Sequence, residues 1–211
     1  MMSSAASRIR EQHAYLSQLD CIAGDGDHGT TMLRIMDRLE TAFTGNAAVD
    51  LKTSFYDASW NVMSCDGGAS SSLLGAFFLG ISEALESAIT SWDCGQFAAG
   101  LEAGLRAVQF QTKARPGDKT LLDALVPAVD AFTAEARAGH DISDALASAA
   151  RAASAGASAT GDLAARYGRA RLLGDKTKGH QDPGAASIAL IFEGFSQAMN
   201  ELKGDAADAR R

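Results

Sequence analysis

Residues 182–202 read DPGAASIALIFEGFSQAMNEL, and this stretch points directly to the fold class. Asp182 is a favourable N-cap residue, and Pro183 stands at the first helical position, where its missing N–H is not needed. Large apolar side chains then recur every three or four residues, which is the spacing of one helix face. They are Ile188, Ile191, Phe192, Phe195, Met199 and Leu202. The segment predicts a long amphipathic helix with one buried face.

The same periodicity continues along the rest of the chain. Residues 31–43 carry apolar side chains at the same spacing, and a further helix is expected after Asp118 as its N-cap, with a kink at Pro127. Five more helices are expected over residues 4–19, 51–63, 70–88, 93–111 and 141–159. No stretch alternates in the way of a half-buried strand. The sequence therefore predicts an all-α protein of about eight helices.

Length and composition favour one domain over residues 1–211. The chain has only 3 prolines, which suits long helices, and no polar linker long enough to separate two domains. Its 21 glycines gather mainly in short clusters, which indicates specialised loops on a helical scaffold. Residues 1–5 and 204–211 are expected to be frayed ends.

Charge and cysteine usage exclude several classes of protein. A net charge of −7 argues against a nucleic-acid binder, which normally presents a basic face. No window of eighteen apolar residues is present, and the first twenty residues lack the apolar core of a signal peptide, so neither membrane insertion nor export is expected. The three cysteines lack CxxC spacing. A cytoplasmic location is therefore expected.

The cluster LDCIAGDGDHG at residues 19–29 is the most informative motif. It holds three carboxylates, Asp20, Asp25 and Asp27, among glycines that allow a tight loop. Hard carboxylate oxygens suit Mg²⁺ or Ca²⁺, although the twelve-residue pattern of an EF-hand is absent. A solvated acidic turn is the alternative interpretation. We favour a metal site.

Three further clusters fit the binding of phosphate. CDGGASSSLLG at residues 65–75 joins a glycine-rich turn to a helix start, where free N–H groups attract anions, although many such turns are only helix starts. RPGDKTLLD at residues 115–123 offers Arg115 or Lys119 to a phosphate, or is simply a capped helix. GRARLLGDKTKGHQDPG at residues 168–184 is basic in an otherwise acidic chain, and could equally be a charged surface loop. Together, the clusters suit phosphoryl transfer.

In order and approximate spacing, these motifs resemble the nucleotide-binding L subunit of dihydroxyacetone kinase. The similarity runs from about Leu19 to Met199. It implies an antiparallel barrel of eight helices with the nucleotide bound among the loops at one end. It also implies ATP or ADP as the nucleotide, with two Mg²⁺ ions held by Asp20, Asp25 and Asp27.

The resemblance assigns further residues to the nucleotide. Arg169 is implied both as a nucleotide contact and as a catalytic residue. The remaining implied contacts are His28, Thr31, Ala69, Ser70, Leu121, Asp182, Pro183 and Gly184. The sequence departs from the family over Ser71, Ser72, Leu73 and Leu74, and at Arg171, Leu172, Asp175, Lys176 and Thr177. These changes leave the metal and nucleotide residues untouched and concern the surface that would meet the substrate-bearing partner.

The resemblance also implies partners. A separate K-type subunit would carry the small ketose, either dihydroxyacetone or a related sugar such as erythrulose. Some family members exchange ATP for ADP, whereas others keep ADP and receive phosphate from a phosphotransferase-system protein, and the motifs do not separate the two. Self-association stays open. The alternative function is a non-catalytic nucleotide sensor that acts by binding a regulatory protein.

Overall fold

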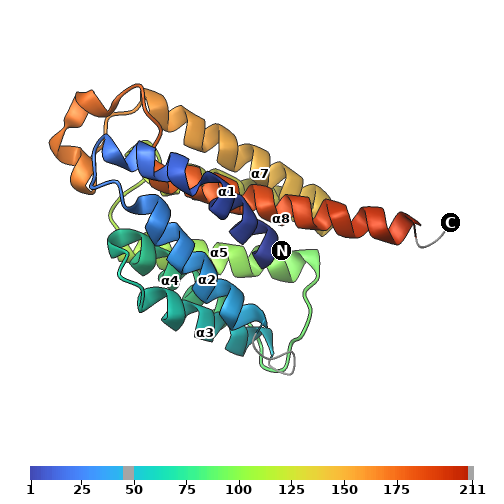
Figure 1. Ribbon diagram of the computed structural model, residues 1–211. Coiled ribbons are helices and arrows are strands. Elements are labelled where there is room, and N and C mark those ends of the chain that lie inside the picture. The colour runs from blue at the N-terminus through green and yellow to red at the C-terminus, as the bar shows by residue number, and fades with distance from the viewer. Residues whose placement is uncertain (45–49, 209–211) are drawn as a thin grey trace.

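The computed structural model describes residues 1–44 and 50–208, with side chains up to residue 204. The described residues form eight α-helices that run up and down in an antiparallel barrel, together with three short 3₁₀ helices in one loop (Figure 1). The α-helices are α1 (Met2–Cys21), α2 (His28–Thr44), α3 (Leu51–Met63), α4 (Gly68–Ala84), α5 (Cys94–Gln111), α6 (Leu122–Arg137), α7 (Ile142–Ala159) and α8 (Pro183–Asp208). The all-α fold of about eight helices is confirmed.

Aspartate N-caps fix where several helices begin. The carboxylates of Asp50, Asp93 and Asp141 each accept a hydrogen bond from the backbone N–H three residues later. At α5 the Gln96 side chain also accepts from the Asp93 N–H, which completes a capping box. Asp182 caps α8 through the Ala185 N–H at 2.8 Å, as the sequence predicts.

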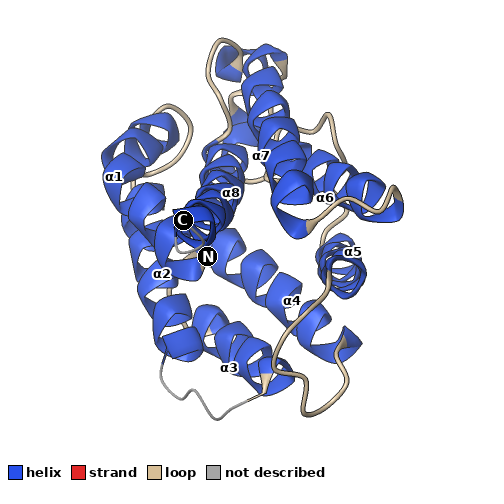
Figure 2. Cartoon of the chain, turned by 90° about the vertical axis from the view of Figure 1, so that its right-hand side faces the viewer, coloured by secondary structure: helices blue, strands red, loops and turns tan. Residues whose placement is uncertain are grey.

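The helices close into a ring because every helix packs against its neighbours in the chain and α8 packs back on α1 (Figure 2). One continuous hydrophobic cluster fills the interior and draws residues from all eight helices. Its fully buried side chains include Ile9, Ile35, Leu125, Phe132 and Leu146. No helix in the described residues is both long and apolar enough to cross a membrane.

The up-and-down topology brings four loops to the same end of the barrel. These are residues 22–27, 64–67, 112–121 and 160–182, and each of them overlaps one of the four sequence clusters. Helices α2, α4, α6 and α8 all begin at this end, so their N–H-rich, electropositive termini gather there. We call it the loop end.

Three expectations differ from the structure. Residues 2–5 are not frayed, because α1 begins at Met2 and Ala5 is fully buried; at the other end, α8 runs to Asp208 and residues 209–211 lie outside the described part. Helix α4 ends at Ala84 rather than residue 88, since Leu85 is extended. Pro127 lies inside α6, and the helix continues through it to Arg137; the kink stays a prediction.

Asp118 is the third difference, because it is not an N-cap. Its carboxylate instead accepts from the Arg115 N–H and closes the turn that contains Pro116 and Gly117. The start of α6 is organised by Asp123, whose carboxylate accepts from the N–H groups of Thr120 and Gly117. A Thr-x-x-Asp spacing is a known helix-start signal, so the start of α6 could have been predicted from residues 120–123.

Candidate functional site

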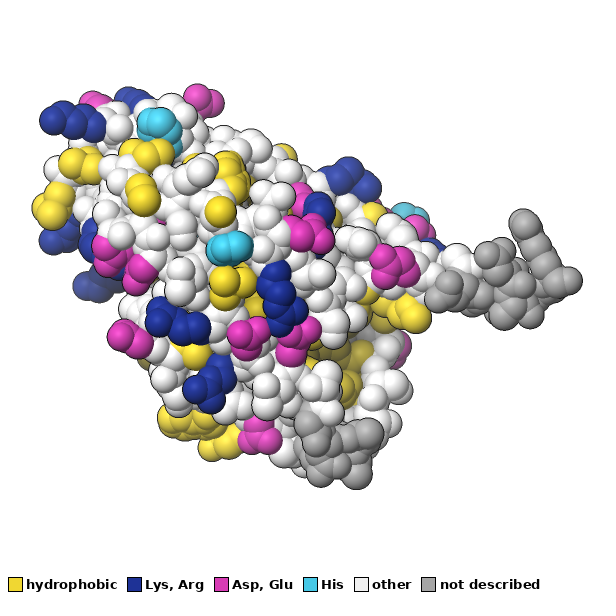
Figure 3. All heavy atoms as spheres, viewed as in Figure 1, with side chains coloured by type: hydrophobic (Ala, Val, Ile, Leu, Met, Phe, Trp, Pro, Cys, Tyr) yellow, Lys and Arg dark blue, Asp and Glu magenta, His cyan; other side chains and the backbone are white. Residues whose placement is uncertain are grey.

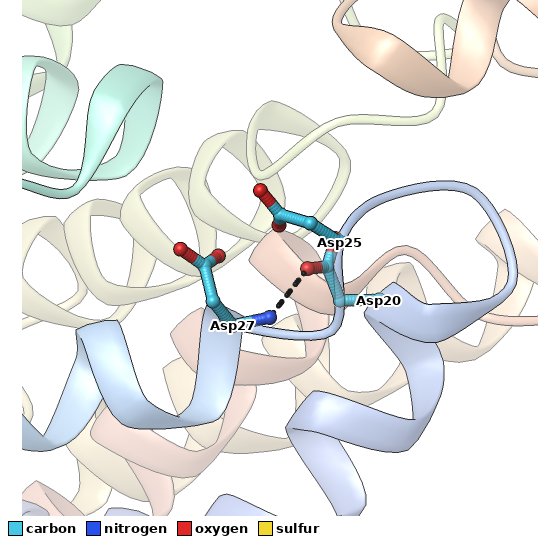
Figure 4. A group of neighbouring side chains, drawn as sticks. All are labelled: Asp20, Asp25 and Asp27. Carbon is cyan, nitrogen blue, oxygen red and sulfur yellow. Dashed lines mark hydrogen bonds between the residues drawn. The ribbon is translucent and has the colours of Figure 1, made fainter.

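Three carboxylates converge at the loop end. Asp20 is in the last turn of α1, and Asp25 and Asp27 follow in the loop to α2 (Figure 4). One oxygen from each carboxylate lies within 4.8 Å of the others, which is close enough to share a metal ion. The Asp20 carboxylate also accepts from the backbone N–H groups of Gly26 at 3.0 Å and Asp27 at 3.1 Å, so it holds the loop that carries the other two.

Two glycines make this loop sterically feasible. A Cβ at Gly24 would lie 2.1 Å from the Asp20 carboxylate oxygen, so any larger residue would displace that carboxylate. Gly26 has a φ of +77°, a left-handed conformation that other residues rarely adopt. The glycine spacing in the sequence is therefore a requirement of the acidic loop.

The charges within this acidic group are unevenly balanced. The Arg169 guanidinium pairs with Asp25 and lowers the pKa of that carboxyl, while burial and the neighbouring Asp25 raise the pKa of Asp27. Three carboxylates held this closely favour a positive charge among them. Their all-oxygen donor set suits a hard divalent cation such as Mg²⁺.

A cavity of about 440 Å³ opens beside the carboxylates, within the range of small-molecule sites. The structure brings nearly all the residues named from the sequence to its wall. These are Asp20, Asp27, His28, Thr31, Ala69, Ser70, Leu121, Arg169, Asp182, Pro183 and Gly184. Asp25 is not part of the wall itself but belongs to the carboxylate group at its edge.

His28 connects two of the helix starts. Its Nε2 lies 2.7 Å from the Ser187 hydroxyl, which itself donates to the Pro183 carbonyl at 3.0 Å. Nε2 must then be the donor, and this assignment leaves Nδ1 as an acceptor that faces the Ser70 hydroxyl at 3.5 Å. Burial lowers the pKa of His28, which favours the neutral ring. Ser187 is a residue that sequence reasoning missed.

The cavity also has an apolar part, of which only Leu121 was named from the sequence. It is lined by Leu73, Ala114, Leu121 and Leu122, which come from α4, the loop before α6 and α6 itself. Tyr167 and Thr112 also line the cavity. A flat apolar ring such as a nucleobase suits these walls, and only the folded chain brings the four aliphatic residues together.

The two cations of the third cluster do not face an open anion site. Lys119 reaches the cavity wall, but its ammonium donates to two backbone carbonyls. Arg115 is exposed and is not among the residues that line the cavity.

In the fourth cluster, Arg169 is the residue that reaches the carboxylates. Lys178 pairs with Asp175 at 2.8 Å, and Arg171 and Lys176 are exposed. Leu172 is 82% exposed in the same loop. Lys and Arg side chains and apolar ones gather at the loop end in the space-filling view (Figure 3). The 160–182 loop is thus anchored on the site at Arg169 and turns a mixed basic and apolar face outward.

Comparison with known proteins agrees with this arrangement. The chain is 37% identical to the ADP-binding subunit DhaL of PEP-dependent dihydroxyacetone kinase 1 from Listeria innocua, over 93% of this chain and 92% of that protein. It is 35% identical to L-erythrulose 1-kinase of Mycolicibacterium smegmatis, over 90% of this chain and 33% of that enzyme.

The fold also matches a crystal structure of the dihydroxyacetone kinase from C. freundii in complex with AMP-PNP and Mg²⁺. The TM-score is 0.72 at 26% sequence identity, and the match covers 93% of this chain and 33% of that one. The chain therefore spans about a third of that enzyme. The model of the DAK2 domain matches residues 22–197, from the acidic loop to the last helix. This chain belongs to the DAK2 domain family.

Proposed function

We propose that this chain is the nucleotide-binding subunit of a dihydroxyacetone-kinase-type phosphotransferase. The observation that carries the proposal is the placement of three carboxylates beside a cavity on which the electropositive starts of α2, α4 and α8 converge. Such a site can hold a polyphosphate together with a divalent cation. The name of the Listeria innocua relative, an ADP-binding subunit, supports the same conclusion.

The carboxylates Asp20, Asp25 and Asp27 would hold Mg²⁺, and their all-oxygen, closely spaced donor set fits that ion. Mg²⁺ neutralises charge on phosphate oxygens during phosphoryl transfer. We propose two ions, as the family resemblance implies.

The other cavity residues would orient the nucleotide. The backbone N–H groups of Ala69 and Ser70, at the start of α4, would donate to phosphate oxygens. The apolar wall that includes Leu121 would hold the base, with Thr31 and His28 beside it and Asp182, Pro183 and Gly184 at the start of α8 closing the site. Arg169 would add positive charge as the phosphoryl group leaves.

The acceptor would be a small ketose held by a separate K-type subunit that docks on the loop end. Relatives named for dihydroxyacetone and for L-erythrulose support both C3 and C4 ketoses. The phosphoryl group would come either from exchanging ATP or from a phosphotransferase-system protein that rephosphorylates retained ADP. Retained ADP agrees with the name of the Listeria innocua relative.

A coupled assay with a K-type subunit and a panel of C3 and C4 ketoses tests the proposal. We expect turnover only when this chain, Mg²⁺, a phosphoryl donor and the K-type subunit are all present. Nucleotide binding without turnover for any ketose, combined with binding to a regulatory protein, would instead select the nucleotide-sensor function.

The donor is tested separately by mass analysis of the protein after gel filtration. ADP that remains bound, and activity that requires phosphotransferase-system proteins, support the relay. Free exchange of the nucleotide, with activity from ATP alone, supports the ATP-dependent route.

A further inference from the structure

Lys119 is a buried lysine whose role is not explained by contact with a phosphate. The residue is only 5% exposed, and its backbone has a φ of +61°, which is unusual for any residue other than glycine. Its ammonium donates to the carbonyl of Thr160 at 2.6 Å and to the carbonyl of His180. A strained backbone at a lysine beside a ligand cavity indicates that the lysine side chain has a function, because its contacts must offset the strain.

The two carbonyls lie at the two ends of one loop. Thr160 follows α7, and His180 stands just before α8, so a single ammonium bridges the point where the loop leaves the barrel and the point where it returns. Two other bonds close the same base: Gly179 N–H to Gly161 O at 2.8 Å, and Asp182 N–H to the Thr160 hydroxyl at 2.8 Å. Lys119 contributes the side chain that joins this base to the start of α6.

The surroundings of the ammonium favour its charge despite burial. Asp123, Asp162 and Asp182 face it from α6, the 3₁₀ turn after α7 and the start of α8, and each opposes the lowering of the Lys119 pKa by burial. An ammonium removed from water in this way needs its hydrogen-bond acceptors. Removing it would also leave two carbonyls at the base of the loop without this donor.

Arg169 is carried by the loop that this base closes. Between the two ends, the backbone of Arg166 donates to the Asp118 carbonyl and the backbone of Ala165 donates to the Thr177 hydroxyl. Farther out, Arg169 meets Asp25 of the acidic loop. The position of the Arg169 guanidinium over the carboxylates therefore depends on how firmly the base of its loop is held.

We propose that Lys119 is a positioning residue that clamps both ends of the 160–180 loop and thereby holds Arg169 over the nucleotide phosphates. The clamp itself is a property of the folded chain, whereas its effect on the nucleotide rests on the function proposed above. Lys119 acts through Arg169 and needs no contact with the nucleotide.

Amide hydrogen exchange of the nucleotide-free protein tests the clamp directly. Lys119→Met keeps an unbranched side chain as far as the ε position and removes the ammonium donors. The matched control is Lys113→Met, at an exposed lysine of the same interhelical segment. We expect exchange over residues 161–180 to accelerate about tenfold or more in Lys119→Met, because two carbonyls at the base of the loop lose their ammonium donor, with no change in α2 and α4. Unchanged protection of the loop, or equal acceleration everywhere, would overturn the proposal.

A double-mutant cycle on ADP dissociation tests the action through Arg169. Lys119→Met and Arg169→Ala should each speed the release of Mg-ADP, and the effect of the second change should shrink when the first is present. Additive effects would show that Lys119 does not act through Arg169. If even the wild-type chain fails to bind ADP, the proposed function fails, but the exchange experiment still decides the clamp.

Lys119→Arg provides a second test in case Lys119→Met does not fold. Its guanidinium can still donate to both carbonyls, so we expect loop protection and ADP release closer to those of the wild type than Lys119→Met gives. Loop exchange in Lys119→Arg as fast as in Lys119→Met would contradict a role for the two hydrogen bonds.

Discussion

The two ends of the barrel are built from the same eight helices but differ in chemistry. The loop end surrounds a cavity of about 440 Å³ with carboxylates, hydroxyls and helix starts. The opposite end surrounds one of about 370 Å³ with almost entirely apolar side chains, many of them aromatic. There Trp92 stacks on Phe55 with ring centroids 5.1 Å apart and also contacts Phe97, which meets Phe132 edge-on.

The backbone differs between the ends as well. In the described part of the chain, six of the seven glycines with positive φ belong to the loop end: Gly26, Gly68, Gly117, Gly168, Gly174 and Gly179. The opposite end has Gly139. One end therefore uses unusual backbone shapes to place polar groups, while the other uses the packing of large rings. Stability and ligand binding should therefore respond to substitutions at different ends of the barrel.

The largest effect on stability is expected at the aromatic end. Phe97→Ala removes a ring that packs between Trp92 and Phe132, so we expect the free energy of unfolding to fall by about 3–5 kcal/mol. Urea denaturation measures the loss. The affinity of the folded protein for Mg-ADP should stay unchanged, and a large loss of affinity would show that the two ends are not independent.

The complementary change is at the carboxylates. Asp25→Ala should weaken Mg²⁺-dependent ADP binding by more than the ten- to hundredfold loss typical of outer metal contacts, because it removes one of the three proposed direct ligands. Calorimetric titration measures this loss, and the unfolding midpoint should hardly change. Asp57→Ala, at an exposed aspartate on α3, is the control. An unchanged ADP affinity in Asp25→Ala would contradict the metal assignment.

A smaller effect separates nucleotide binding from docking of the K-type subunit. Leu172→Asp places a charge at the exposed apolar tip of the 160–182 loop, and we expect the half-saturating concentration of the K-type subunit to rise about tenfold or more, the equivalent of one buried leucine. ADP affinity should not change. Leu202→Asp, on the part of α8 remote from the loop end, is the matched control, and an equal effect from it would refute docking at Leu172.

The smallest effect concerns pH. Burial raises the pKa of Asp182 to about 7, with Asp123 reinforcing the rise and Lys119 opposing it, so the folded chain retains a proton that the unfolded chain loses near pH 4. This stabilising contribution is complete below about pH 4 and is lost as the pH rises through 7. Asp182→Asn keeps an N-cap and should flatten this part of the stability profile by about 1 kcal/mol or more. Urea unfolding at several pH values without nucleotide measures it, and an identical pH slope in the variant would contradict the assignment.

The sequence predicted the helices well because their signals are local. The apolar spacing after Pro183 and the cap at Asp182 concern residues within one or two turns, and the structure confirms them. The prediction of Asp118 as an N-cap was wrong because a second aspartate, Asp123, also lies near the start of α6. Which of them organises that start depends on the turn at Pro116 and Gly117.

The site was predictable to a similar extent. The acidic loop is local, and its glycines are required by its own geometry, so the sequence alone identified Asp20, Asp25 and Asp27 as one group. The apolar wall at Leu73 and Ala114, and the bond from His28 to Ser187, join segments far apart in the chain. No local pattern marks such pairs.

By itself, then, the sequence determined an all-α chain with an acidic, glycine-rich loop, because helix periodicity, capping and loop geometry act over a few residues. Only the tertiary structure decided that α8 closes on α1, that four loops share one end, and that Lys119 binds both ends of the loop carrying Arg169. The physical reason is distance along the chain. A buried ammonium or carboxylate takes its role from the partners that packing brings to it, and those partners stand up to 61 residues away from Lys119.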